Sequence, residues 1–123
     1  MNKVLVVEDN SDNLQLVTYA LERAGYEVVG ATTGEEAVLL VERVKPLFIL
    51  MDIQLPGIDG IETTRQIRKS VAGRQVPIIA VTSYAMRGDQ EKVLEAGCTA
   101  YFEKPIDPLT FVESVRKILA ENR

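Results

Sequence analysis

The sequence lacks histidine and tryptophan entirely and contains a single cysteine. Without histidine, the chain cannot form a Ser-His-Asp triad or a Cys-His pair, and it cannot ligate a metal through imidazole. Cys98 has no partner for an internal disulfide, and its position before an apolar stretch predicts a small buried side chain. A phosphoryl group carried on histidine would therefore have to come from another protein.

Long hydrophobic runs are also missing. The first apolar run, residues 4–7, is too short for the core of a signal peptide. No segment approaches the ~18 apolar residues that a membrane span requires. We therefore expect a cytoplasmic protein that does not use a membrane as a partner.

Clustered positive charge is absent as well. The formal net charge is −4, which disfavours direct binding to nucleic acid, because that binding is carried by groups of Lys and Arg. With 123 residues, 46% of them hydrophobic, the chain is long enough for one domain with a substantial core and too short for two. We find no repeat, low-complexity tract or linker, and expect a single domain over residues 1–123.

Short β-branched runs alternate with helical patterns along the whole chain. This alternation predicts an α/β fold with a five-stranded parallel sheet that is covered by helices on both faces. The strands are expected at residues 3–7, 27–31, 48–51, 78–81 and 100–102. A doubly wound sheet of this size most often has the strand order 2-1-3-4-5, and binds ligands outside the carboxyl ends of strands 1 and 3.

Capping residues and apolar stripes predict the helices. Ser11 is the expected N-cap of the first helix, which stops at Gly25. Further helices are expected at 33–44, at 59–70 with Asp59 as N-cap, and at 87–96. The last helix has the strongest start signal, with Asp107 as N-cap and Pro108 at the first helical position.

Three carboxylates fall where apolar runs end. Glu8 and Asp9 follow the first predicted strand, and Asp52 follows the third. Carboxylates held so close together raise one another's pKa values unless a cation neutralises them, and an oxygen-only site suits Mg²⁺. The sequence therefore predicts a magnesium site at this edge of the sheet.

A hydroxyl and an ammonium are expected at the same edge. Thr82 ends the fourth strand and Lys104 follows the fifth. An aspartate such as Asp52 can accept a phosphoryl group as an acyl phosphate, Mg²⁺ can screen the transferred oxygens, and Thr and Lys can hold the others. The set is suited to phosphoryl transfer.

Four motifs in order carry a family resemblance. They are Val-Glu-Asp-Asn at 7–10, Met-Asp-Ile-Gln-Leu-Pro-Gly-Ile-Asp-Gly at 51–60, Val-Thr-Ser at 81–83 and Lys-Pro at 104–105. Together they resemble the receiver domain of two-component response regulators, over the whole chain. The resemblance implies the flavodoxin-like (βα)5 receiver fold and a cytoplasmic signalling switch, phosphorylated within a phosphorelay, that is not an enzyme in the ordinary sense.

The resemblance also implies roles for individual residues. Asp52 would be the phosphoacceptor, with Asp9 as a direct Mg²⁺ ligand and Glu8 as a ligand acting through water. The backbone carbonyl of Gln54 would complete the protein ligands. Two further side chains, Thr82 and Lys104, would bind phosphoryl oxygens.

Features beside the phosphoryl group follow from the same resemblance. Tyr101 matches the family's aromatic switch and would respond to Thr82, and the peptide bond before Pro105 is expected to be cis. Gln54 and Tyr84 occupy variable positions of the family. The bulk of Tyr84 would hinder an attacking water molecule and slow self-dephosphorylation.

Each residue has a plainer interpretation when taken alone. Asp9 or Asn10 could cap the first helix, and Asp52 could be a turn residue. Lys104 could be an ordinary surface charge, and Tyr101 could simply pack on a half-exposed strand. The coincidence of all the motif positions favours the functional interpretation for the site residues.

Competing functions were compared on the same residues. An aspartyl-phosphate phosphatase would carry a second Asp two positions after the first, where this chain has Ser11 after Asp9. A nucleotide-binding domain would need glycines after the first strand. A degenerate receiver used only for interaction would not need all the site residues. The remaining alternative is a receiver domain cut from a hybrid kinase, since no output domain is expected on this chain.

The expected partner is a sensor histidine kinase or a histidine phosphotransfer domain. Leu14, Pro105 and Ile106 could form a small apolar docking patch beside Asp52, although Leu14 could equally be the edge of the core. A downstream protein would bind the first helix, or the face formed by the fifth strand with the fourth and fifth helices. We expect a monomer, with dimerisation on phosphorylation as an alternative.

Overall fold

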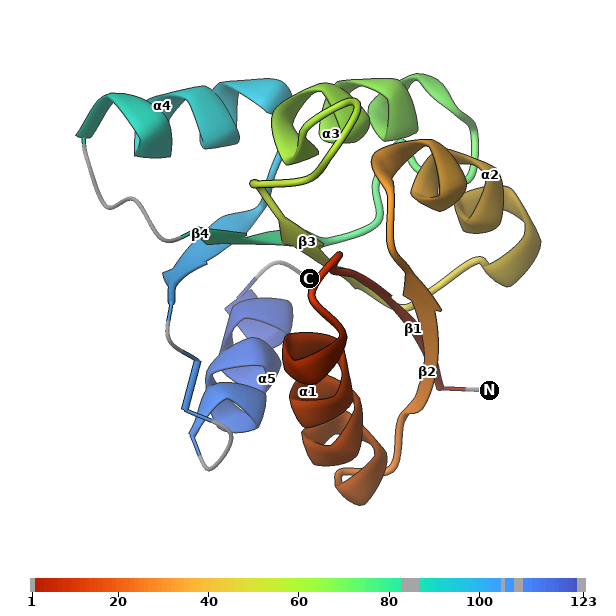
Figure 1. The fold of residues 1–123 in the computed structure, drawn as a ribbon, viewed down its shortest axis with the longest axis vertical. Coiled ribbons are helices and arrows are strands. Elements are labelled where there is room, and N and C mark those ends of the chain that lie inside the picture. Colours follow the sequence, from red (N-terminus) through yellow and green to blue (C-terminus); the bar gives the residue numbers. More distant parts are fainter. Residues whose placement is uncertain (1, 83–86, 105, 108–109, 122–123) are drawn as a thin grey trace.

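The computed structural model describes residues 2–82, 87–104, 106–107 and 110–121. Five strands alternate with five helices in this part of the chain (Figure 1). The strands are β1 (Lys3–Val7), β2 (Glu27–Ala31), β3 (Ile49–Asp52), β4 (Ile78–Thr82) and β5 (Ala100–Glu103). The helices are α1 (Ser11–Arg23), α2 (Gly34–Val44), α3 (Gly60–Lys69), α4 (Arg87–Ala96) and α5 (Phe111–Glu121).

All strand pairs are parallel and the order is β2-β1-β3-β4-β5, as the sequence predicted. Helices α1 and α5 cover one face of the sheet, and α2, α3 and α4 cover the other (Figure 1). This arrangement brings the carboxyl ends of β1 and β3 side by side at the point where the strand order reverses.

The side chains of successive residues in each central strand point into two separate cores, one on each face of the sheet. Leu5 and Val7 of β1 point into the core under α2, α3 and α4, whereas Val4 and Val6 point into the core under α1 and α5. This alternation explains the continuous apolar runs, because a strand buried on both faces has no polar side. Cys98 is buried in the first of these cores, which confirms the prediction from sequence.

The predicted element boundaries need small corrections. The N-cap of α1 is Asn10 and not Ser11, because Oδ1 of Asn10 accepts the amide of Asn13 at 3.0 Å. Strand β3 is shifted by one residue, so that Asp52 is its last residue. Asp59 caps α3 as predicted, by accepting the amide of Glu62 at 2.9 Å.

The start of the last helix is partly described. The carbonyl of Asp107 accepts the amides of Thr110 at 3.1 Å and Phe111 at 3.0 Å, so the chain already turns at Asp107, whereas regular helix is described from Phe111. Pro108, predicted at the first helical position, lies outside the described residues.

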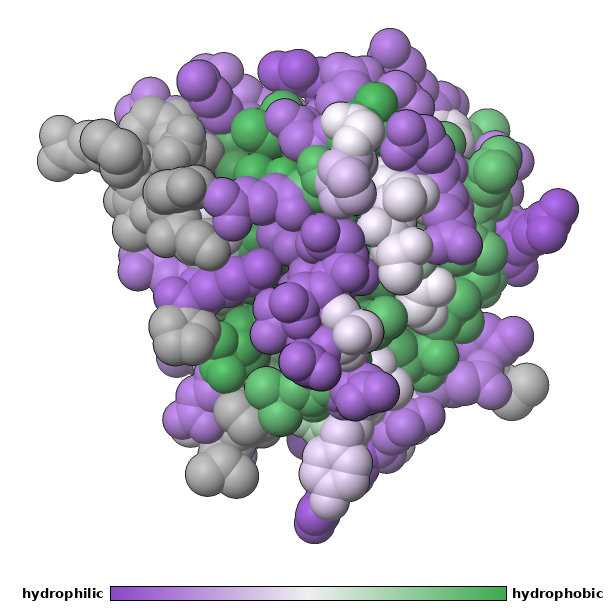
Figure 2. Space-filling model, viewed as in Figure 1, coloured by the Kyte–Doolittle hydropathy of each residue, from purple (hydrophilic) through white to green (hydrophobic). Residues whose placement is uncertain are grey.

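One face of the molecule is mostly polar. On the face shown in Figure 2, hydrophilic residues surround smaller apolar areas. Within the described ranges, no helix combines the length and the apolar character needed to cross a membrane.

Candidate phosphoryl-transfer site

Four polar side chains lie at one edge of the sheet, each at or directly after the end of a strand. Asp52 ends β3 and Thr82 ends β4, while Glu8 and Lys104 directly follow β1 and β5. The β3–β4 register places Asp52 opposite Val81, one residue before Thr82. The backbone amide of Lys104 donates to the carbonyl of Thr82 at 2.8 Å, which fixes the start of the segment after β5. The parallel pairing therefore gathers residues that are far apart in the sequence.

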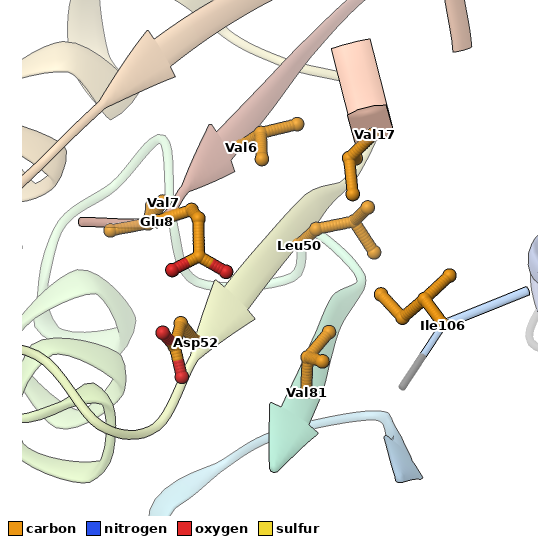
Figure 3. Close-up of a pocket in the computed structure, with 8 residues that line it drawn as sticks. All are labelled: Val6, Val7, Glu8, Val17, Leu50, Asp52, Val81 and Ile106. Carbon is orange, nitrogen blue, oxygen red and sulfur yellow. The ribbon is translucent and has the colours of Figure 1, made fainter. Parts of the chain in front are cut away.

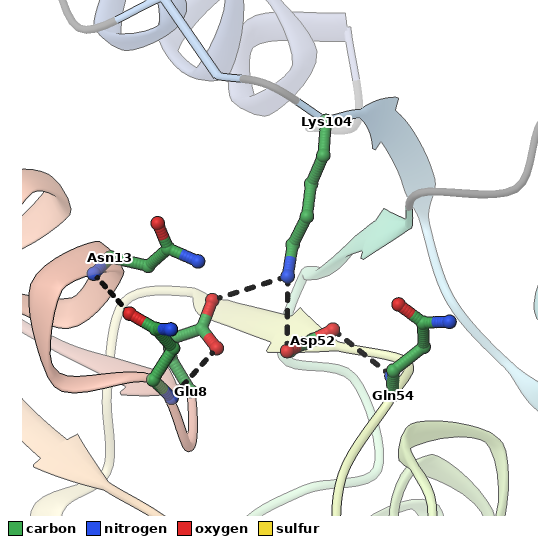
Figure 4. Close-up of polar contacts among 6 residues, drawn as sticks. Glu8, Asn13, Asp52, Gln54 and Lys104 are labelled. Carbon is green, nitrogen blue, oxygen red and sulfur yellow. Dashed lines mark hydrogen bonds and ion pairs between the residues drawn. The ribbon is translucent and has the colours of Figure 1, made fainter.

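Lys104 bridges two of the carboxylates (Figure 4). Its Nζ lies 3.1 Å from Oδ2 of Asp52 and 3.4 Å from Oε1 of Glu8. Asp52 is only 3% exposed and Glu8 only 6%, so both charges lie away from bulk water. A buried carboxylate pair is stabilised only when a cation or hydrogen bonds compensate it, and Lys104 supplies the positive charge here.

Backbone amides hold the other carboxylate oxygens (Figure 4). The amide of Asn10 donates to Oε2 of Glu8 at 3.2 Å, and the amide of Gln54 donates to Oδ1 of Asp52 at 3.0 Å. These bonds orient both carboxylates before any ligand arrives. The role of Asn10 was not foreseen from the sequence as a site contact, only as a possible helix cap.

The burial and close contacts of Glu8 and Lys104 shift the pKa values of both groups. Burial, and next the neighbouring Asp52, raise the pKa of Glu8 to about 7, although Lys104 pulls it the other way. Burial lowers the pKa of Lys104, but the hydrogen bond and charge of Asp52 and the charge of Glu8 outweigh burial and raise it. The site thus carries a surplus of negative charge that a divalent cation would relieve.

A metal-ligating cluster stands at this position. One carboxylate oxygen each from Glu8, Asp9 and Asp52 lie within 4.8 Å of one another, with Asp9 exposed and the other two buried. Carboxylate oxygens in such a group are the donors that Mg²⁺ prefers. The residues therefore fit a magnesium ion, as the sequence indicated. The exposed Gln54 follows two residues after Asp52, where its carbonyl remains a predicted ligand.

Gly60 lets α3 begin against the end of β3. A Cβ at this position would lie 2.5 Å from the carbonyl oxygen of Asp52, too close for any side chain. The amide of Gly60 donates to the carbonyl of Ile53 at 3.0 Å, which closes the loop behind Asp52. The only sequence signal for this role was the position of Gly60 at the end of the Met-Asp motif.

Behind the carboxylates lies a small apolar chamber (Figure 3). It has a volume of about 10 Å³, near the lower limit for one water molecule. Glu8 and Asp52 face each other at one side of it, and Val17, Leu50 and Ile106 stand at the other. These apolar walls are the physical reason for the strong desolvation of Glu8.

The structure also describes several of the residues predicted for switching and docking, and Ile106 among them lines the chamber. Tyr101 pairs with Ala80 in the β4–β5 ladder and packs against the core that includes Ala80. Leu14 and Ile106 are half-buried and both pack against the core under α1 and α5. Pro105, the third docking residue with its predicted cis bond, and Tyr84 lie outside the described residues.

Comparison with known proteins agrees with this geometry. The family described as response regulator receiver domain matches residues 4–116. The chain belongs to the response regulator receiver family. This receiver is 41% identical over 118 residues to the polar-differentiation response regulator DivK of Brucella anthropi, an alignment that covers 96% of each protein.

Solved structures of receivers share the fold. The receiver domain of a sensor histidine kinase from Pseudomonas aeruginosa, with a magnesium ion coordinated in its active-site cleft, is 38% identical, with a TM-score of 0.88 over 97% of this chain and 98% of that one. The chemotaxis response regulator CheY4 of Vibrio cholerae is 28% identical, with a TM-score of 0.90 over 96% of this chain and 98% of that one. The flavodoxin-like receiver fold predicted from sequence is confirmed.

Proposed function

We propose that this receiver is a phosphorylation-dependent switch whose phosphoacceptor is Asp52. The observation that carries the proposal is the position of the Asp52 carboxylate, which lies within reach of Lys104 on one side and of Glu8 and Asp9 on the other. Asp52 combines two features among the described carboxylates. It ends a central strand, and it lies beside a cation and two further acids.

The phosphoryl group would pass from a phosphohistidine on a partner protein to Asp52 of this chain. An oxygen of Asp52 attacks the phosphorus of a phosphohistidine, so that a P–O bond forms as the P–N bond breaks. The electron pair of the broken bond stays on the imidazole nitrogen, which takes up a proton from solvent. The product is an acyl phosphate on Asp52 and a neutral histidine on the donor.

Lys104 and Thr82 hold the transferred group. The Nζ of Lys104 already lies 3.1 Å from Asp52 and can exchange this contact for a phosphoryl oxygen. Thr82 is 3% exposed at the end of the neighbouring strand, where its hydroxyl can bind another oxygen. Fixed donors of this kind stabilise the charge that spreads over the phosphoryl oxygens during transfer.

A Mg²⁺ ion would be held by the carboxylates of Asp9 and Asp52, by Glu8 through water, and by the carbonyl of Gln54. Such an ion supplies charge neutralisation for the phosphoryl oxygens. Glu8 and Asp52 are kept facing each other by the backbone amides of Asn10 and Gln54.

The residues favour a switch over a phosphatase. Ser11 is an exposed residue in the first turn of α1 and takes the place where a phosphatase would carry its general acid. Without that acid, release of phosphate would depend on water alone. We therefore propose that the protein signals through binding and that turnover on phosphate esters is absent.

The donor would be a histidine kinase or a histidine phosphotransfer domain that docks around Asp52, with Leu14 and Ile106 as apolar contacts. Both side chains are half-buried against the core under α1 and α5, which keeps them in place for docking. The downstream target would bind the α4-β5-α5 face or α1. A stand-alone domain, as in DivK, and a receiver within a hybrid kinase both remain compatible with these residues.

Acetyl phosphate with Mg²⁺, followed by mass spectrometry, tests the acceptor. We expect one phosphoryl group on Asp52 and none on the Asp52→Asn variant. Labelling of another residue, or undiminished labelling of the variant, would refute the proposal. Leu14→Gln and Ile106→Gln should slow transfer from a cognate kinase and leave acetyl-phosphate labelling intact, whereas a loss of both reactions would assign these residues to the fold.

A further inference from the structure

The end of the sheet opposite Asp52 carries an open groove of mixed apolar and polar lining. It lies between the α2–β3 connection and the α3–β4 connection, where β3 and β4 begin, and has a volume of about 490 Å³. An overlapping hollow of about 460 Å³ extends it towards the end of α2. Six of its lining residues are apolar, namely Pro46, Leu47, Val71, Ala72, Val76 and Pro77, and the other two are Arg74 and Gln75.

The groove has exposed walls and a fixed floor. Val71 is 81% exposed and Leu47 is 47% exposed on its walls, while Ala72 and Val76 pack against the core below. Single exposed apolar side chains are ordinary on protein surfaces. Several that line one concave surface are typical of a binding site.

Hydrogen bonds hold the groove in shape. Nη1 of Arg68 donates to the carbonyls of Gly73 at 2.9 Å and Val76 at 2.6 Å, which holds the α3–β4 connection in place. On the other wall, the amide of Leu47 donates to the carbonyl of Lys3 at 2.8 Å. A surface that is already ordered loses little conformational entropy when a partner binds.

The charge around the groove differs from that of the whole chain. Its basic lining residues are Lys45 and Arg74, both exposed, against one acidic residue, Glu42. The groove lining therefore carries one more basic than acidic residue, in a chain whose net charge is −4. An apolar segment flanked by carboxylates would therefore match this surface better than a basic one.

We propose that this groove docks an acidic amphipathic helix of a partner protein. The apolar side chains of such a helix, spaced three and four residues apart, would contact Leu47 and Val71, and its flanking Asp or Glu residues would pair with Lys45 and Arg74. The groove lies at the other end of the strands from Asp52, so a partner bound here leaves the phosphoacceptor accessible. The proposal stands independently of the proposed function.

The test is a titration of the isotope-labelled protein, followed by NMR, with three synthetic helical peptides of about four turns. The first has Leu at the contact positions and Glu on the flanks. The second replaces the Glu residues by Lys, and the third keeps Glu but replaces Leu by Ser. We expect saturable amide shifts around Leu47, Val71 and Gln75 with the first peptide, and affinity at least about tenfold weaker with the other two.

Variants separate the groove from the rest of the surface. Val71→Ser and Arg74→Gln should each weaken binding of the first peptide by about tenfold. Leu16→Ser is the matched control, because Leu16 is 44% exposed on α1 at the other face of the sheet. Thermal unfolding of each variant checks the fold, and Arg74→Gln provides the independent test if Val71→Ser unfolds.

Several results would overturn the proposal. These are equal binding of the Lys-flanked or the Ser-substituted peptide, shifts confined to the Asp52 end of the sheet, or no saturable binding. Sedimentation of the protein alone provides a further arm. A dimer that Val71→Ser dissociates would assign the groove to a second copy of this chain, and the acidic helix would then be the wrong occupant.

Discussion

Nζ of Lys104 lies 3.1 Å from Oδ2 of Asp52, although 52 residues separate them along the chain. The same ammonium lies 3.4 Å from Oε1 of Glu8, so one positive charge is shared between two buried acids. A divalent cation at these carboxylates and the ammonium would repel each other. Metal binding and the position of Lys104 are therefore coupled.

Lys104→Gln should raise the Mg²⁺ affinity and lower the rate at which Asp52 is labelled. Mg²⁺ affinity should rise by about threefold to tenfold, because the competing positive charge is removed. Labelling of Asp52 by acetyl phosphate should fall by about tenfold to a hundredfold, because a donor to the phosphoryl oxygens is lost. Calorimetric titration and labelling rates measure the two effects, and a parallel fall in both would indicate damage to the fold instead.

The stability of the metal-free protein should decrease as the pH rises from about 4.5 to about 7. Between these values the folded protein keeps a proton on Glu8, whose pKa is raised to about 7 from an ordinary 4.5, while the unfolded chain has lost it. Stability falls with pH wherever the folded state binds more protons. Urea unfolding in the presence of a chelator measures this slope.

Glu8→Gln provides the control for that slope, because an amide does not titrate in this range. The variant should show a flatter dependence of unfolding free energy on pH between about 4.5 and 7. Saturating Mg²⁺ should flatten the slope of the original protein too, since a bound cation favours the carboxylate. An unchanged slope in the variant would contradict the assignment to Glu8.

Phosphorylation should change the surroundings of both Thr82 and Tyr101. Tyr101 pairs with Ala80, two residues before Thr82 on the same strand, so the two side chains lie on the same face of the sheet. We expect beryllofluoride with Mg²⁺ to shift the amide and ring resonances of both residues, and Thr82→Ala to weaken the response at Tyr101. Tyr26, which packs edge-on against Phe48 in the opposite core, is the reference ring and should not respond.

Lys45→Gly should stabilise the protein by about 0.5 to 1 kcal/mol. Lys45 ends α2 with a φ of 49°, which costs a residue with a side chain about 1 to 2 kcal/mol, partly offset by the greater freedom of glycine in the unfolded chain. Chemical denaturation measures the gain. Lys45→Ala keeps the Cβ and should show no stabilisation.

The sequence predicted the strands from local patterns, and it predicted their order from the one most common in doubly wound sheets of this size. Apolar runs buried on both faces identify parallel strands, and strand ends then meet at one edge. Asp52, Thr82 and Lys104 could therefore be placed at that edge before the structure was known. The family and its fold followed from the motifs at those ends.

Details that depend on side-chain packing could not be predicted. Adjacent residues Glu8 and Asp9 differ sharply, one buried beside an apolar chamber and the other exposed, and no periodicity distinguishes them. The cap at Asn10 in place of Ser11 depends on which oxygen reaches a free amide. The role of Arg68 depends on three carbonyls from two connections that meet only in the folded protein.

Arg68 also anchors the carboxyl end of α4. Its Nε and Nη2 donate to the carbonyl of Gly97 at 2.9 Å and 2.7 Å, which ties the residue just after α4 to α3. The other end of α4 begins five residues after Thr82. A displacement that starts at Thr82 would therefore shift the first turn of α4 more than its last turn, because the last turn is held at Gly97.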